Sequence, residues 1–305
     1  TTMASYCTTH PESVDALFEE AAKRKMSVVA GKTCMDRNAP QNLLDSPKSA
    51  YEDSEKLIKK WHRNGRAIYA ISPRFAPTSS PEQLENLGEL WKKYSDCLMQ
   101  THISEQKEEI NWVKKLFPKS IDYLDVYEKF NLIGEGSVFG HAVHLTFRER
   151  KRILETKSAI AHCPTSNMFI GSGIFNLKGI INENSIVGLA TDTGGGSSFS
   201  MFRTMAATYE LAQLKGFSVH PSQLLWLSTI GSAKALNQHD KIGNLKKGLF
   251  ADLTIIDLNP KNFINQNMSC YGEVWSDLFR VIMMGDERNI KEVWVSGKPV
   301  FNKIH

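Results

Sequence analysis

The chain has 305 residues, of which 41% are hydrophobic and 23% are charged, with a formal net charge of +4. A chain of this length and composition can bury a sizeable core without disulfides or structural metals. It predicts one large or two smaller globular α/β domains. Basic and acidic residues are interspersed, and no basic run or apolar stretch is long enough to bind nucleic acid or to span a membrane, so we expect neither partner. The five cysteines are scattered without a Cys-x-x-Cys pair, which is typical of reduced thiols and predicts a cytoplasmic location.

Strand-like and helix-like segments alternate in the first 240 residues. The predicted strands are residues 1–7, 26–35, 66–75, 96–104, 137–145, 158–167 and 185–192. Residues at helical spacing follow most of them, for example over 11–25, 49–62, 80–94, 146–154 and 200–214. Strict alternation predicts a parallel sheet with helices outside it. The seven predicted strands are one short of a closed (β/α)8 TIM barrel, and an open doubly wound sheet stays an alternative.

The pattern changes after about residue 240. Residues 241–258 and 290–302 are short strand-like runs with glycine turns, and we expect no long helix between them. We therefore predict a barrel domain over residues 1–240 and part of a small β domain over residues 241–305.

Side chains suited to metal binding, proton transfer or ligand binding lie in or at the ends of several predicted strands. They are Arg74, Phe75, His102, His141, His162 and Asp192. Each of these residues alone could have a purely structural role. Lone histidines near apolar strands are mostly structural, and aspartates after strands mostly cap helices. In a barrel, however, the carboxyl ends of the strands converge on one mouth. Imidazole and carboxylate groups there suit zinc or iron, and Glu105, just behind His102, suits proton transfer.

Several of these stretches resemble a known superfamily. The segments "QTHISE", "GHAVHL", "AHCPTSN" and "GLATDTGGGSSFSM" are similar to amidohydrolase motifs. Within that superfamily, "MDRNAP", "PRFAPTSSPEQL", "HPESVDALFEEA" and "GDERNIKEVWVSGK" resemble the guanine deaminase family. The resemblance extends over nearly the whole chain.

The resemblance implies a fold, a reaction and a cofactor. The fold is an α/β barrel of the amidohydrolase type beside a small β-sandwich. The reaction is the hydrolysis of guanine to xanthine and ammonia in purine catabolism. One divalent metal ion is expected per subunit, usually Zn2+ with Fe2+ as the alternative, and family members are commonly homodimers.

The resemblance also implies roles for the strand-end residues. His102 and Asp192 would be metal ligands, Glu105 the proton shuttle, and His141 a hydrogen-bond partner of the hydrolytic water. Arg74 would hydrogen-bond guanine while the Phe75 ring packs on it. Glu105 and both predicted ligands would also face the substrate.

One family feature does not occur in this sequence. The first barrel strand of the family ends in a His-x-His pair that supplies two metal ligands, and no His-x-His occurs in these residues. We therefore expect a sequence that lacks the first barrel strand, its helix and half of the small β domain, with weak zinc binding and no activity by itself. Two rival functions stay open. One is a related deaminase or chlorohydrolase acting on another ring, and the other is a non-enzymatic binding or scaffold protein.

Overall fold

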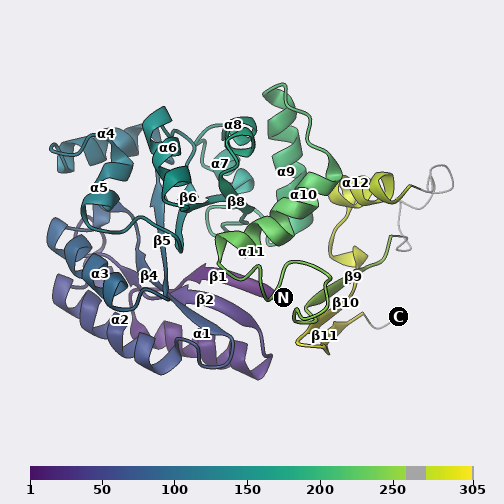
Figure 1. The fold of residues 1–305 in the computed structure, drawn as a ribbon, viewed down its shortest axis with the longest axis horizontal. Coiled ribbons are helices and arrows are strands. Elements are labelled where there is room, and N and C mark those ends of the chain that lie inside the picture. Colours follow the sequence, from purple (N-terminus) through teal and green to yellow (C-terminus); the bar gives the residue numbers. More distant parts are fainter. Residues whose placement is uncertain (259–272, 304–305) are drawn as a thin grey trace. The chain divides into compact units, whose positions relative to one another are not determined.

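The computed structural model describes residues 1–258 and 273–303, which form two compact units (Figure 1). We call residues 2–161 with 183–186 the N-terminal unit. Residue 1, residues 162–182 and the described residues from 187 onward form the C-terminal unit. Each unit is described by itself.

A parallel sheet forms the centre of the N-terminal unit. Its strand order is β1 (Thr2–Tyr6), β2 (Ser27–Gly31), β4 (Ala67–Pro73), β5 (Leu98–Ile103), β6 (Ser137–His141) and β7 (Ala159–His162), of which the last residue belongs to the C-terminal unit. A short strand, β3 (Thr33–Cys34), pairs with the end of β4. All these pairings are parallel, which confirms the sheet predicted from strand–helix alternation.

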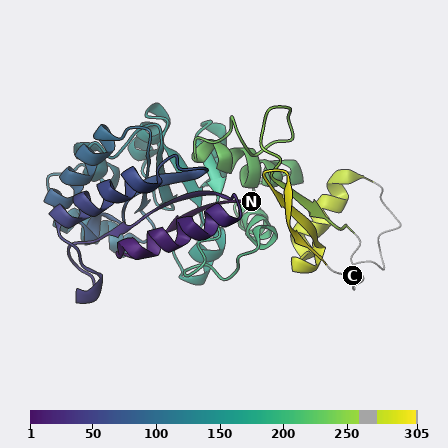
Figure 2. The same cartoon turned by 90° about the horizontal axis from the view of Figure 1, so that it is seen from below.

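Helices connect these strands and pack against the sheet. They are α1 (Pro11–Lys23), α2 (Pro47–Trp61), α3 (Pro81–Lys93), α4 (Lys107–Leu116), α5 (Tyr123–Lys129) and α6 (Phe147–Glu155). Helix α1 lies along the sheet (Figure 2). Its Val14 and Phe18 are one turn apart and both buried, so one apolar stripe fixes which face meets the sheet. Because Thr146 and Glu149 cap the first turn of α6 reciprocally, that helix begins where its sequence predicts.

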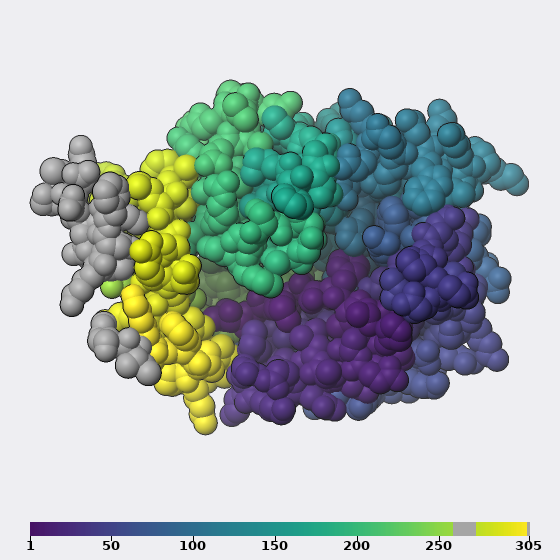
Figure 3. All heavy atoms as spheres, turned by 180° about the vertical axis from the view of Figure 1, so that it is seen from behind, coloured from purple at the N-terminus to yellow at the C-terminus, as the bar shows by residue number. Residues whose placement is uncertain are grey.

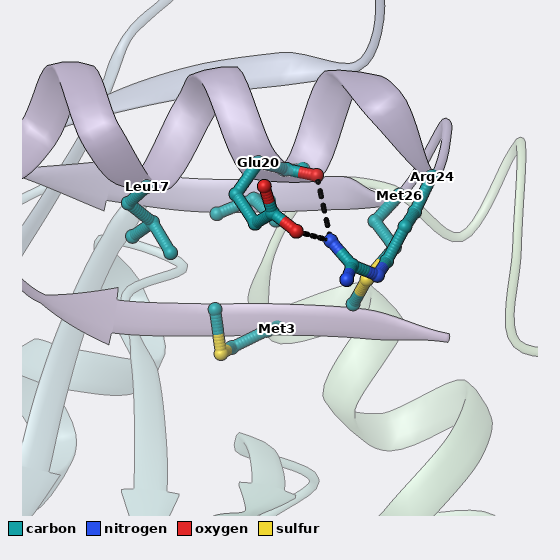
Figure 4. A pocket seen from close by; sticks show the side chains of 7 residues that line it. Met3, Leu17, Glu20, Arg24 and Met26 are labelled. Carbon is teal, nitrogen blue, oxygen red and sulfur yellow. Dashed lines mark hydrogen bonds and ion pairs between the residues drawn. The ribbon is translucent and has the colours of Figure 1, made fainter.

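A shallow apolar cavity lies at the amino end of this sheet (Figure 4). Its volume is about 260 Å³, and its lining comes from β1, α1, β2 and the residue before β2: Met3, Leu17, Glu20, Ala21, Arg24, Met26 and Val28. Arg24 donates hydrogen bonds to the carboxylate and the carbonyl of Glu20, so the two charged groups there neutralise each other. The N-terminal residues reach the surface of their unit, as the purple atoms of Figure 3 show.

Helices and a second sheet make up the C-terminal unit. Its helices are α7 (Pro164–Phe169), α8 (Leu177–Asn182), α9 (Met201–Leu214), α10 (Pro221–Trp226), the π-helical turn Leu227–Gly231, α11 (Ser232–Ala235) and α12 (Val274–Met284). Strand β8 (Ile186–Leu189) enters this unit after its first residue, and Ala190 donates a backbone hydrogen bond to the His162 carbonyl at 2.9 Å. Strands β9 (Leu253–Ile256), β10 (Ile290–Val295) and β11 (Lys298–Asn302) form an antiparallel sheet.

The expectation of no long helix between residues 258 and 290 is wrong. Helix α12 has 11 residues there and packs beside α9, where Phe279 meets Tyr209 edge-on with ring centroids 4.9 Å apart (Figure 1). Its sequence, "VWSDLFRVIMM", gathers Ser276, Asp277 and Arg280 on one face and leaves the other faces apolar, so a helical periodicity was present in the sequence. Residues 259–272, which contain Cys270, and residues 304–305 lie outside the described part of the chain. Among the described helices, none is both long and apolar enough to span a bilayer.

Candidate active site

Five of the predicted site residues lie at the carboxyl ends of three neighbouring strands in the N-terminal unit. Arg74 and Phe75 follow β4, His102 lies within β5 and Glu105 just beyond it, and His141 ends β6. The register of β5 and β6 pairs Ile103 with His141. Parallel pairing therefore brings residues far apart in the sequence to one edge of the sheet.

The backbone at this edge adopts an unusual conformation. Ser104, His141 and Ala142 have φ values of 48°, 68° and 51°. Residues with a Cβ rarely occupy this left-handed region, and such strain persists mainly where the surrounding structure enforces it for function. In the C-terminal unit Asp192 has a φ of 47°. Of the predicted site residues, His141 and Asp192 thus carry this strain themselves.

The His102 ring is held on both faces and by one nitrogen. It stacks between Tyr6, at a centroid distance of 4.7 Å, and His141, at 5.4 Å. Its Nδ1 lies 2.6 Å from the Arg74 carbonyl oxygen. Since a carbonyl only accepts, Nδ1 carries the hydrogen, and in the neutral ring Nε2 then carries the lone pair. This is the tautomer that a metal-binding histidine requires.

Glu105 and His141 form a carboxylate–imidazole pair. The Glu105 Oε1 and the His141 Nδ1 are 3.3 Å apart, and their side chains are 16% and 3% exposed. The chain around Glu105 is fixed by Glu109, whose Oε2 accepts hydrogen bonds from the amides of Glu105 at 3.1 Å and Gln106 at 3.0 Å. Burial raises the pKa of Glu109. A shielded carboxylate beside an imidazole, held on a fixed loop, can transfer protons.

Arg74 and Phe75 present a cation and a ring beside these groups. The Arg74 guanidinium lies 5.2 Å from the Phe75 ring centroid, and the Phe75 ring meets Trp112 edge-on at 6.3 Å. Arg74 is exposed and Phe75 is half-buried, so both remain accessible to a ligand. A guanidinium and an aromatic face are suited to a flat, polar heterocycle.

Asp192 belongs to the C-terminal unit and lies three residues after the end of β8. Its carbonyl accepts hydrogen bonds from the amides of Gly195 at 3.1 Å and Gly196 at 2.5 Å, which closes the glycine turn. A Cβ on Gly195 would lie 2.7 Å from the Ser166 Oγ and 3.1 Å from the Asp192 Oδ2. A Cβ on Gly196 would clash with the Thr191 backbone carbonyl, so the turn needs glycine at that position. His162, in the same unit, is buried and stacks on Phe175 at 4.5 Å.

His62, Asp96 and Cys97 lie close enough together to hold a metal ion, but their contacts have a structural explanation. The His62 Nδ1 accepts a hydrogen bond from the Tyr69 amide at 3.1 Å, so its hydrogen is on Nε2. That nitrogen lies 3.2 Å from the Asp96 Oδ2. With the Nδ1 lone pair already used, the group is an imidazole–carboxylate contact that supports the fold rather than a metal centre.

Sequence reasoning missed Tyr6, Trp112 and Glu109. Tyr6 ends β1, so a rule that inspects every strand end for aromatic as well as titratable groups would have found it. Glu109 stands three residues after the N-cap Gln106, as in a capping box, and that signal was available. Trp112 lies inside α4 and carries no local signal of its contact with Phe75.

Comparison with known proteins places the chain in a family. The model of the amidohydrolase family matches residues 1–300. The chain belongs to the amidohydrolase family. This amidohydrolase is 44% identical to guanine deaminase of Escherichia coli (strain K12) over 303 residues, which are 99% of this chain and 69% of that protein. The solved structure of the E. coli enzyme matches with a TM-score of 0.98, over 100% of this chain and 71% of the other.

Two further solved structures extend the comparison. Guanine deaminase from C. acetobutylicum, with guanine bound in its active site, is 30% identical with a TM-score of 0.90, over 99% of this chain and 72% of that one. An adenosine deaminase from Xanthomonas campestris with bound zinc is 19% identical with a TM-score of 0.82, over 95% and 64% of the two chains, and it shares the fold. The amidohydrolase described here thus spans about two thirds of the length of its curated relatives.

Proposed function

We propose that this amidohydrolase is a guanine deaminase, which hydrolyses guanine to xanthine and ammonia. The observation that carries the proposal is that the Arg74–Phe75 pair lies next to His102 in the N-terminal unit. The Arg74–Phe75 pair follows the strand beside the one that bears His102, and the Arg74 carbonyl holds the His102 ring. Similarity to the E. coli and C. acetobutylicum guanine deaminases supports guanine as the substrate.

We further propose that His102 and Asp192 are ligands of a divalent metal ion, Zn2+ in the first place and Fe2+ as the alternative. The His102 tautomer, with its lone pair on Nε2, fits that role. A carboxylate such as that of Asp192 is a ligand suited to either ion. When bound, such an ion activates water for attack at neutral pH.

The protein's own residues would divide the remaining work. The Arg74 guanidinium donates hydrogen bonds to acceptor atoms of the purine, and the Phe75 ring packs on its face. As water adds to the amino-bearing carbon, the Glu105 carboxyl gives a proton to the adjacent ring nitrogen. The resulting Glu105 carboxylate takes the proton from the hydroxyl of the added water and passes it to the departing amino group, so that ammonia leaves and a carbonyl remains. His141, next to Glu105, would hold the attacking water by a hydrogen bond.

A substrate panel tests this proposal. The protein is expressed from its complete reading frame, loaded with Zn2+, and assayed for ammonia release from guanine, adenine, adenosine, cytosine and a chlorotriazine. We expect the highest kcat/KM with guanine. A higher value with another ring would make the protein a related hydrolase. A folded, zinc-loaded protein that turns over no ring would instead support a binding role.

Three earlier expectations stay predictions. They are the domain boundary near residue 240, a homodimeric assembly and a cytoplasmic location. Sedimentation analysis of the purified protein would test the second.

A further inference from the structure

Tyr127 is hydrogen-bonded to two segments of the candidate active site. It lies on α5 and its side chain is 0% exposed. Its hydroxyl donates a hydrogen bond to the His102 carbonyl at 2.8 Å, and it accepts one from the Ala76 amide at 2.9 Å and one from the Thr101 Oγ1 at 3.1 Å. One donor and two acceptor interactions are what a phenolic hydroxyl can make, so the group is used in full.

These partners belong to the two parts of the proposed site. Ala76 begins the turn directly after Phe75, so its amide fixes the chain that carries the aromatic ring. Thr101 and His102 are consecutive residues of β5. The same two segments also meet at the Arg74 carbonyl, which accepts from the His102 amide at 3.2 Å and from the His102 Nδ1 at 2.6 Å. The Tyr127 hydroxyl is thus a second link between them.

The tyrosine ring is held separately from its hydroxyl. It stacks on Tyr123 with centroids 5.7 Å apart and packs at a tilt against Phe139 at 5.8 Å. Burial raises the pKa of Tyr127, so the hydroxyl keeps the hydrogen that it donates to His102. Replacing the tyrosine by phenylalanine would keep these ring contacts and would leave polar groups of the site without their partner.

We propose that Tyr127 is a positioning residue that holds the metal-binding strand at His102 in register with the purine-binding turn at Arg74 and Phe75. The proposal rests on the proposed function, because it assigns those three residues their roles. Tyr127 touches neither substrate nor metal in this scheme, and it acts through the backbone of the residues that do.

The test compares Tyr127→Phe with Tyr69→Phe in the zinc-loaded protein. Tyr69 is also 0% exposed, and its hydroxyl accepts a hydrogen bond from the Lys32 amide at 3.3 Å, outside the proposed site. Because the loss of a residue that orients a metal ligand typically costs 10–100-fold in activity or metal affinity, we expect Tyr127→Phe to raise the KM for guanine, lower kcat and release zinc faster to a chelator by about that factor in total. Tyr69→Phe should leave all three values within about twofold of wild type, as a change remote from the site does.

A measurement without substrate or metal separates this proposal from the proposed function. In the metal-free protein, the His102 ring nitrogens observed by NMR should show one tautomer in wild type and Tyr69→Phe, and a mixture in Tyr127→Phe. If wild type does not deaminate guanine, the function fails while this measurement still decides the role of Tyr127. If Tyr127→Phe folds with an unchanged tautomer, KM and zinc release rate, Tyr127 only packs the core and the proposal is overturned.

Discussion

The two ends of the sheet in the N-terminal unit differ in chemistry. The amino end holds the cavity of about 260 Å³, lined by aliphatic and sulfur-containing side chains and by the mutually neutralised Glu20 and Arg24. The carboxyl end holds the stacked imidazoles of His102 and His141, the Glu105 carboxylate beside His141, and residues with positive φ. The cavity at the amino end therefore lacks the imidazoles that gather at the carboxyl end. Convergent titratable groups mark the candidate site at the carboxyl end, whereas positive φ values also occur at other residues, for example Lys25 and Arg63.

The largest effect is expected from removing the proposed proton carrier. In Glu105→Gln the side chain keeps its size and loses the proton that it transfers, so kcat for guanine should decrease about 10²–10⁴-fold. Steady-state ammonia release measures this, with thermal unfolding as the check that the variant folds. A variant that keeps wild-type kcat would remove Glu105 from the mechanism.

A smaller effect is expected at the purine-binding turn. Arg74→Ala removes a charged donor while leaving the backbone carbonyl that holds His102. A hydrogen bond to a charged group contributes about 1.5–3 kcal/mol, so kcat/KM should decrease roughly 10–150-fold, mainly through KM. Arg74→Lys should recover only part of this, since an ammonium group lacks the planar fork. Equal loss in kcat with an unchanged KM would contradict a role in ground-state binding.

A pH effect on stability is expected from Glu109. Burial raises its pKa above the ordinary value of 4.5, so the folded state binds the proton more tightly than the unfolded state. From about pH 4.5 up to the raised pKa, this group makes the unfolding free energy decrease as pH rises, by at most about 1.4 kcal/mol per pH unit. Glu109→Gln removes the titrating group and should flatten that part of the curve. Urea unfolding at several pH values compares the two proteins, and parallel curves would count against the assignment.

The smallest effect is expected at the amino end. Leu17 lines the cavity and is half-buried, so Leu17→Ala should destabilise the fold by about 1 kcal/mol. Activity toward guanine at 25 °C should not change, because the side chain lies at the opposite end of the sheet from the strand-end residues. Thermal unfolding and kcat/KM give the two values. A large loss of activity without unfolding would contradict the view that only the carboxyl end of the sheet serves activity.

Much of this site could be predicted from local sequence. Apolar strands at regular intervals, each followed by a helix, determined a parallel sheet, and parallel strands end on one side. A histidine, a carboxylate or an arginine after a strand is then a candidate without any coordinates. His102, Glu105, His141 and Arg74 were found in this way.

Only the tertiary structure decided how these residues are held. The tautomer of His102 depends on a carbonyl 28 positions earlier, and Tyr127 reaches residues 25, 26 and 51 positions away. Hydrophobic period and capping act over a few residues, and so a sequence displays them directly. The partner of a buried hydroxyl or ring nitrogen is set by how distant segments cross, and that is known only once the chain is folded.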